Sequence, residues 1–206
     1  MTCMCNGDRT IRHNRIRDTT YNEACDGALR PEREKSGLLP ARPAEDGLGT
    51  ATASSDARRP ADIWFPRGEQ GGPEAADFAV TSGLRPDMYR AVIDNPMVVF
   101  DQYEAFKRSY KETHQCCQDQ GLLFSPMVLE AHGGGWSPAF RRLIDWIARN
   151  SAAANSDSSS STSLRIAQRI SCSLQRENAR AVLKRLVPRT SDPTYTWGES
   201  ASTDTW

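Results

Sequence analysis

Two aspartates in short strand-like segments are the residues of this chain best suited to chemistry. Asp62 lies in the segment Arg-Pro-Ala-Asp-Ile-Trp (59–64) and Asp77 begins the segment Asp-Phe-Ala-Val-Thr-Ser (77–82), with fourteen residues between them. A hairpin joining the two segments would bring both carboxylates to one place. Two neighbouring carboxylates are the minimum needed to hold Mg²⁺ against a phosphate. The pair raises the hypothesis of a metal-dependent nuclease, and the alternative is that each is an ordinary aspartate at a strand end or turn.

Two further side chains could serve such a site. Lys107 and Tyr110 are three residues apart on a predicted helix, so they share a face and Lys107 could lean over the sheet edge. Glu130, with His132, ends a predicted strand just before three glycines and could add a metal ligand or position a water molecule. The alternatives are a solvated lysine beside a core tyrosine, and a glycine-rich turn with polar ends.

Positive charge is concentrated near the carboxyl end of the chain. The 206 residues include 26 Lys or Arg and 26 Asp or Glu, so the net charge is zero, but from Arg165 to Arg189 there are seven basic residues and one acid. Local patches of this kind attract polyanions. The candidate phosphate contacts are Arg165, Arg169, Arg176, Arg180 and Lys184. The alternative is a solvated helix face that covers the core.

The composition argues against membrane-spanning and disulfide-rich classes. No segment approaches the run of about 18 apolar residues that crosses a bilayer. The six cysteines are too scattered for a disulfide scaffold, so free thiols and an intracellular location are expected. Cys3, Cys5 and His13 resemble pieces of a zinc site, but the spacing is too tight and no second pair follows closely.

Hydrophobic periodicity, glycines and prolines predict the elements that would position these residues. Helices are expected over 8–29 (stopped by Gly27), over 98–120 (capped by Gly121), and from Pro138 with Ser137 as its cap. Strands are expected within 31–39 (best at 37–39) and over 61–66, 75–82 and 122–129. The order predicts an α/β fold with a small mixed β-sheet flanked by helices.

The remaining segments are assigned mainly by composition. A flexible loop is expected over 40–57, a Ser-rich linker over 151–163 and a disordered tail over 188–206. Between the linker and the tail, a basic amphipathic helix over 164–187 would form a C-terminal helical extension. Its predicted inward residues are Ile166, Ile170, Leu174, Val182 and Leu186.

Taken together, the motifs resemble a known family. The segment 59–62 followed by Asp77 looks like the Arg-Pro-Asp…Asp/Glu signature of the restriction-like endonuclease domain that lies behind the reverse transcriptase of some non-LTR retrotransposons. That domain has the PD-(D/E)XK nuclease fold. Further segments that are similar to the carboxy-terminal region of such polyproteins are 7–14, 34–40, 126–136 and 175–180. The resemblance spans roughly 3–187, and its restriction-endonuclease-like part is 8–150.

The resemblance implies a role for each candidate residue. Asp62 and Asp77 would be the metal-binding acids, with Glu130 assisting and Arg59 among the nucleic-acid contacts. The lysine expected two residues after the second acid is replaced by Ala79, and Lys107 in its Lys-x-x-Tyr setting would supply it from the next helix. Residues 1–7, with Cys3 and Cys5, look like the trailing remnant of a zinc knuckle whose upstream ligands are missing, so zinc is not expected.

The sequence therefore supports three hypotheses. The first is a Mg²⁺-dependent DNA endonuclease derived from a retroelement polyprotein, without the upstream reverse transcriptase and knuckle, nuclear if it acts on DNA. The second is a catalytically silent module that binds DNA or RNA. The third is an expressed fragment with no selected function.

Overall fold

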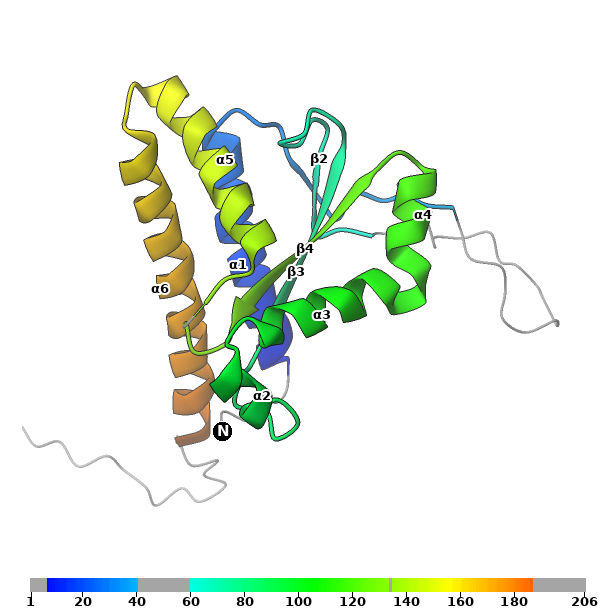
Figure 1. Cartoon of the computed structure of the whole chain (residues 1–206). Helices are drawn as coiled ribbons and strands as arrows, with labels where there is room; N and C mark the ends of the chain where they lie inside the picture. Colours follow the sequence, from blue (N-terminus) through cyan, green and yellow to red (C-terminus); the bar gives the residue numbers. More distant parts are fainter. Residues whose placement is uncertain (1–6, 41–59, 134, 187–206) are drawn as a thin grey trace, which may run out of the picture.

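The fold is a four-stranded sheet with helices on both faces (Figure 1). The computed structural model describes residues 7–40, 60–133 and 135–186. The elements in chain order are α1 (Asp8–Asp26), β1 (Glu32–Arg33), β2 (Ile63–Phe65), β3 (Glu74–Thr81), α2 (Tyr89–Asp94), α3 (Val98–Ser109), a 3₁₀ turn η1 (Tyr110–Glu112), α4 (Thr113–Asp119), β4 (Leu123–Glu130), α5 (Pro138–Asn155) and α6 (Ser159–Leu186).

The sheet has the order β1-β2-β3-β4 and is mixed. β1 pairs antiparallel with β2, and β2 pairs antiparallel with β3 through a glycine-rich turn. β3 and β4 are parallel, with Asp77 opposite Pro126, and the segment from α2 to α4 makes the crossover between them. The expected mixed α/β fold with a small sheet is confirmed.

Side chains of β3 alternate between two helical layers, which decides where Asp77 points. Phe78 lies in the main core with residues of α1, α5 and α6. Ala75 packs with Cys117 of α4, and Ala79 packs with Val99 of α3. Because alternate residues of a strand face the same side, Asp77 shares the face of Ala75 and Ala79, toward α3. Figure 1 shows α1, α5 and α6 on one side of the sheet and α3 and α4 on the other.

α6 contributes directly to the main core. Ile166, Ile170 and Leu174 are buried there as predicted. Val182 and Leu186 are exposed instead, and Glu177 and Ala181 are the buried residues of the last turns. The predicted inward face is wrong beyond Leu174 because α6 there packs against the polar first half of α1, where Arg15 contacts Glu177.

Two predicted elements differ from the structure in position or continuity. The first strand is Glu32–Arg33 rather than residues 37–39, whose Leu39 is a buried contact of Ala75 and Phe124. The helix expected over 98–120 is broken after Ser109, since Lys111 and Glu112 have φ of 51° and 54°. Positive φ ends a right-handed helix, and neither residue is a glycine that would signal it. α2 has no counterpart among the predicted elements.

The segment 151–163 is helical over most of its length rather than a linker. α5 continues to Asn155 and α6 begins at Ser159, so residues 156–158 alone connect them. Ser151, Ala152 and Thr162 are buried, because small side chains let the two helices approach closely where they meet. The composition that resembles a linker here reflects helix packing.

Several expectations fall on residues outside the described ranges. They concern the knuckle remnant at 1–7, the loop at 40–57 and the tail at 188–206, apart from the boundary residues Gly7 and Pro40, together with Arg59. Within the described ranges, no helix is both long enough and apolar enough to cross a membrane.

Ser137 joins β4 to the first turn of α5, and this gives a test of the fold. Its buried Oγ accepts hydrogen bonds from the N–H groups of Phe140 (3.3 Å) and Val128 (3.2 Å). Replacing Ser137 with Ala removes the helix cap and leaves a strand N–H without its partner, so we expect a loss of about 2 kcal/mol in the free energy of unfolding. Urea unfolding measures it.

Ser160→Ala is the matched control. Ser160 is exposed in the first turn of α6, and this change should stay within about 0.5 kcal/mol of the wild type. Equal unfolding free energies for Ser137→Ala and the wild type would contradict the role given to Ser137.

Candidate functional site

Asp62 lies where β2 begins, beside the open part of β3. Its N–H donates to the carbonyl of Ala76 at 3.0 Å. β2 pairs with residues 74–76 of β3, so the backbone of β3 beyond Ala76 meets no residue of β2. The Oδ2 atom of Asp62 fills this place by accepting a hydrogen bond from the N–H of Phe78 at 2.6 Å. The carboxylate therefore replaces the backbone of β2 as the hydrogen-bond acceptor for this part of β3.

Asp77 and Lys107 form an ion pair on the α3 side of the sheet. Lys107 is in the last turn of α3, and its Nζ atom lies 2.7 Å from Oδ2 of Asp77. The side chains are 23% and 19% exposed, so both are largely withdrawn from water yet accessible from outside. The structure thus brings the predicted lysine to the second predicted acid.

His13 of α1 completes the cluster, and the sequence reasoning did not place it there. Its Nε2 atom lies 3.0 Å from Oδ2 of Asp62 and 3.1 Å from the carbonyl oxygen of Phe78. His13 thus contacts Asp62, while Cys3 and Cys5, with which the sequence grouped it, lie outside the described residues. The available signal was its position in the segment 7–14, one of those that carry the family resemblance. Spacing alone gives no sign of a contact across 49 residues.

The charges of this cluster act on one another. Burial raises the pKa of Asp77, and the negative charge of Asp62 raises it further, while Lys107 and His13 oppose the rise; the resulting pKa is about 6. Burial lowers the pKa of Lys107, but Asp77 and Asp62 outweigh it, so this pKa is raised and the ammonium stays charged at neutral pH. Burial also lowers the pKa of His13, but the hydrogen bond and negative charge of Asp62, together with the hydrogen bonds to Asn14 and Phe78, outweigh it, so this pKa is raised.

The two aspartates could hold a cation only together with further ligands such as water or phosphate oxygens. Among residues 7–40, 60–133 and 135–186, no three or more His, Cys, Asp or Glu residues are grouped closely enough to hold a metal. Mg²⁺ usually keeps several water molecules and binds through one or two carboxylates together with phosphate oxygens. Asp62 and Asp77 supply that number, and a divalent cation would relieve the repulsion between them.

Glu130 is not part of this cluster. In the pairing of β3 with β4, Glu130 lies opposite Thr81, and Thr81 is four residues beyond Asp77. Four strand residues span about 13 Å. Its Oε2 atom accepts a hydrogen bond from the N–H of His132 at 2.7 Å. The structure therefore places Glu130 at the end of β4, where its side chain contacts the turn that follows.

The basic residues of α6 mostly face acids of α1. Arg165 and Arg169 both contact the buried Glu23. Arg180 contacts Asp8 and Glu177, and Lys184 is 3.9 Å from Asp8. Burial opposes ionisation of Asp8, but Arg185, Lys184 and Arg180 outweigh it and lower the pKa of this carboxyl.

These contacts neutralise much of the predicted basic face. Arg176 is exposed. α6 packs on α1 and α5, on the side of the sheet opposite α3 and away from Asp77 (Figure 1).

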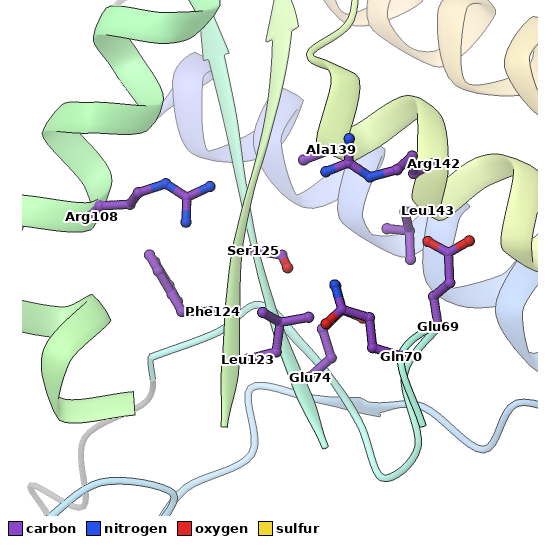
Figure 2. A pocket seen from close by; sticks show the side chains of 10 residues that line it. All are labelled: Glu69, Gln70, Glu74, Arg108, Leu123, Phe124, Ser125, Ala139, Arg142 and Leu143. Carbon is purple, nitrogen blue, oxygen red and sulfur yellow. The ribbon is translucent and has the colours of Figure 1, made fainter. Parts of the chain in front are cut away.

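A separate pocket opens along the outer side of β4. Figure 2 shows Arg108 of α3 and Arg142 of α5 reaching toward it from opposite faces of the sheet, with Ser125 and Glu74 between them. Its volume is about 100 Å³. Burial raises the pKa of Glu74 there, against a hydrogen bond from Ser125. The pocket is not lined by Asp62, Asp77, Lys107 or His13, although Arg108 directly follows Lys107.

Comparisons of the chain with protein-family models, with curated proteins and with solved structures found no match.

The raised pKa of Asp77 predicts that this residue destabilises the folded protein at neutral pH. The folded state holds the Asp77 proton up to about pH 6, whereas an ordinary aspartate releases it near 3.8. The unfolded state therefore gains stability relative to the folded state as the pH rises through this window. The difference between the two pKa values corresponds to about 3 kcal/mol.

We therefore expect Asp77→Asn, which cannot ionise, to be more stable than the wild type at about pH 8, by up to about 3 kcal/mol, and to lose this advantage at about pH 4. Urea unfolding at both pH values measures the difference. Asp101→Asn, at an exposed site on the same helix as Lys107, is the control and should show no such dependence. A pH-independent difference for Asp77→Asn would contradict the electrostatic description of the cluster.

Proposed function

We propose that this protein is a Mg²⁺-dependent DNA endonuclease that hydrolyses or nicks phosphodiester bonds at the cluster of Asp62, Asp77 and Lys107. The observation that carries the proposal is the 2.7 Å contact between Lys107 and Asp77, at a carboxyl whose pKa is also raised by Asp62. Two acids and a charged lysine from three separate parts of the chain are what phosphodiester hydrolysis requires.

Each residue has a distinct task in this proposal. Asp62 is held in one orientation by the N–H of Phe78 and by His13, so this carboxylate needs no further ordering to act as an oxygen donor. Asp77 provides the second oxygen donor. Bound Mg²⁺ would supply positive charge for a phosphate oxygen and lower the pKa of a water molecule. Lys107, released from Asp77, would stabilise the negative charge that develops on the phosphate.

The resemblance to the restriction-like endonuclease domain of retrotransposon polyproteins supports the same proposal. That family's PD-(D/E)XK fold places two acids on neighbouring strands and, in these enzymes, takes the lysine from the next helix. Ala79 stands where the usual lysine would be, and Lys107 reaches the second acid from α3. The mixed sheet between two helical layers is compatible with that fold.

A silent binding module is the less favoured alternative. It would use the basic face of α6, but Arg165, Arg169 and Arg180 already contact acids of α1. Binding of a phosphate backbone would have to compete with those contacts.

Nicking of supercoiled plasmid in Mg²⁺ tests the proposed activity. Asp62→Asn, Asp77→Asn and Lys107→Met should each lower the nicking rate by about 100-fold or more, because the first two weaken Mg²⁺ binding and the third removes the positive charge that stabilises the phosphate. Asp101→Asn should retain the wild-type rate, and EDTA should abolish nicking. Activity that persists in the Asp62 and Asp77 variants, or a wild type that does not nick, would overturn the proposal.

A further inference from the structure

Three aromatic rings form a row along the end of α3, which we call the aromatic stripe: Tyr103, Phe106 and Tyr110. The ring centroids of Tyr103 and Phe106 are 5.9 Å apart, and those of Phe106 and Tyr110 are 5.6 Å apart. Phe106 is 53% exposed and Tyr110 50%, whereas Tyr103 is half-buried and joins the row to the core beneath α3. Large rings that remain in water in a continuous row typically mark a surface that another molecule covers.

The stripe surrounds the lysine of the proposed site. Lys107 follows Phe106 directly and lies one helical turn from both Tyr103 and Tyr110. Tyr103 is near enough to Lys107 to raise the pKa of its ammonium group. If a phosphate of a nucleic-acid chain reaches Asp77, the neighbouring nucleotides of that chain would therefore lie over these rings.

Positive charge is placed around the rings in a way that suits a phosphate backbone. The Nζ atom of Lys111 is 5.6 Å from the centroid of the Tyr110 ring, and Lys107, which follows Phe106 in the chain, pairs with Asp77. The nearby acid Glu104 contacts Arg108, whose guanidinium group extends toward β4 (Figure 2). Cations interleaved with exposed aromatic rings are typical of surfaces that bind single-stranded nucleic acid.

The chain conformation after α3 keeps the last ring at the surface. Tyr110 has ψ of 111°, outside the helical range, and Lys111 and Glu112 follow with positive φ. The chain then turns through η1 into α4, and the ring of Tyr110 remains 50% exposed. Non-glycine residues with positive φ are costly and occur preferentially at functional sites.

We infer that the aromatic stripe is a stacking platform for the bases of unpaired nucleic acid, adjoining the cluster of Asp77 and Lys107. The inference rests on the proposed function and narrows its substrate to DNA with single-stranded nucleotides next to the bond that is cut. Bases in a duplex are stacked on one another and cannot offer their faces to a protein ring, whereas unpaired bases can.

Fluorescence anisotropy with labelled oligothymidylate of about 20 nucleotides tests the stripe, in EDTA so that no cleavage occurs. Phe106→Ala and Tyr110→Ala should each weaken binding by about 10-fold, and Phe106→Trp should retain it because it keeps a stacking ring. Binding of a duplex of the same length should change by less than about two-fold in these variants.

Tyr89→Ala is the matched control, because Tyr89 is an equally exposed tyrosine on α2, outside the stripe. Circular dichroism checks that each variant is folded. Unchanged oligothymidylate binding in the folded Phe106 and Tyr110 variants, or an equal loss for duplex, would overturn the inference. So would sedimentation showing that the wild type is a dimer that Phe106→Ala dissociates.

The two proposals can fail separately. Plasmid nicking, combined with oligothymidylate binding that is unchanged in the Phe106 and Tyr110 variants, overturns the stacking platform alone. Stripe-dependent binding of oligothymidylate without nicking overturns the endonuclease alone.

Discussion

The hydrogen bond from the N–H of Phe78 to the carboxylate of Asp62 connects the sheet to the candidate site. β2 begins at Ile63, so Phe78 would otherwise have an unpaired backbone donor in the middle of a largely buried strand. Such a donor is costly to leave unsatisfied. A carboxylate in this place satisfies the backbone and at the same time positions a charge beside Asp77.

The two aspartates also contact side chains from both helical layers. His13 of α1 contacts the same Asp62 oxygen and the carbonyl of Phe78, which ties the helix on one face to the edge of the sheet. On the other face, Lys107 of α3 balances part of the negative charge at Asp77. The result is a partly buried group of two acids and two bases whose positions are fixed by elements that pack into separate clusters. Arrangements that hold like charges together in this way are more often found at functional sites than in purely structural ones.

The elements of the fold that the sequence predicted well are those with a strong local pattern. The alternation in β3, the apolar run in β4 and the Ser-Pro start of α5 depend on neighbouring residues only. The break after α3 was missed because Lys111 and Glu112 carry no glycine signal. The segment 151–163 was misjudged because its small residues suit both a linker and a close helix contact.

The contact between Lys107 and Asp77 was predictable because two signals coincided. The spacing of Asp62 and Asp77 and the family resemblance both indicated the acids, and the resemblance indicated Lys107. His13 was missed since a single polar residue on a helix has no spacing signature, and its partner is set by tertiary packing. The α6 arginines were assigned to phosphate by composition, which does not reveal that Glu23 and Asp8 lie opposite them.

Metal binding at the two aspartates is the central claim, and paramagnetic broadening by Mn²⁺ in an amide NMR spectrum tests it most directly. The account predicts that Mn²⁺ broadens the amide signals of Asp62, Asp77 and Phe78 at lower concentrations than those of Glu130 and His132, and that this order is lost in Asp77→Asn. Broadening centred elsewhere, or no selective broadening, would contradict it.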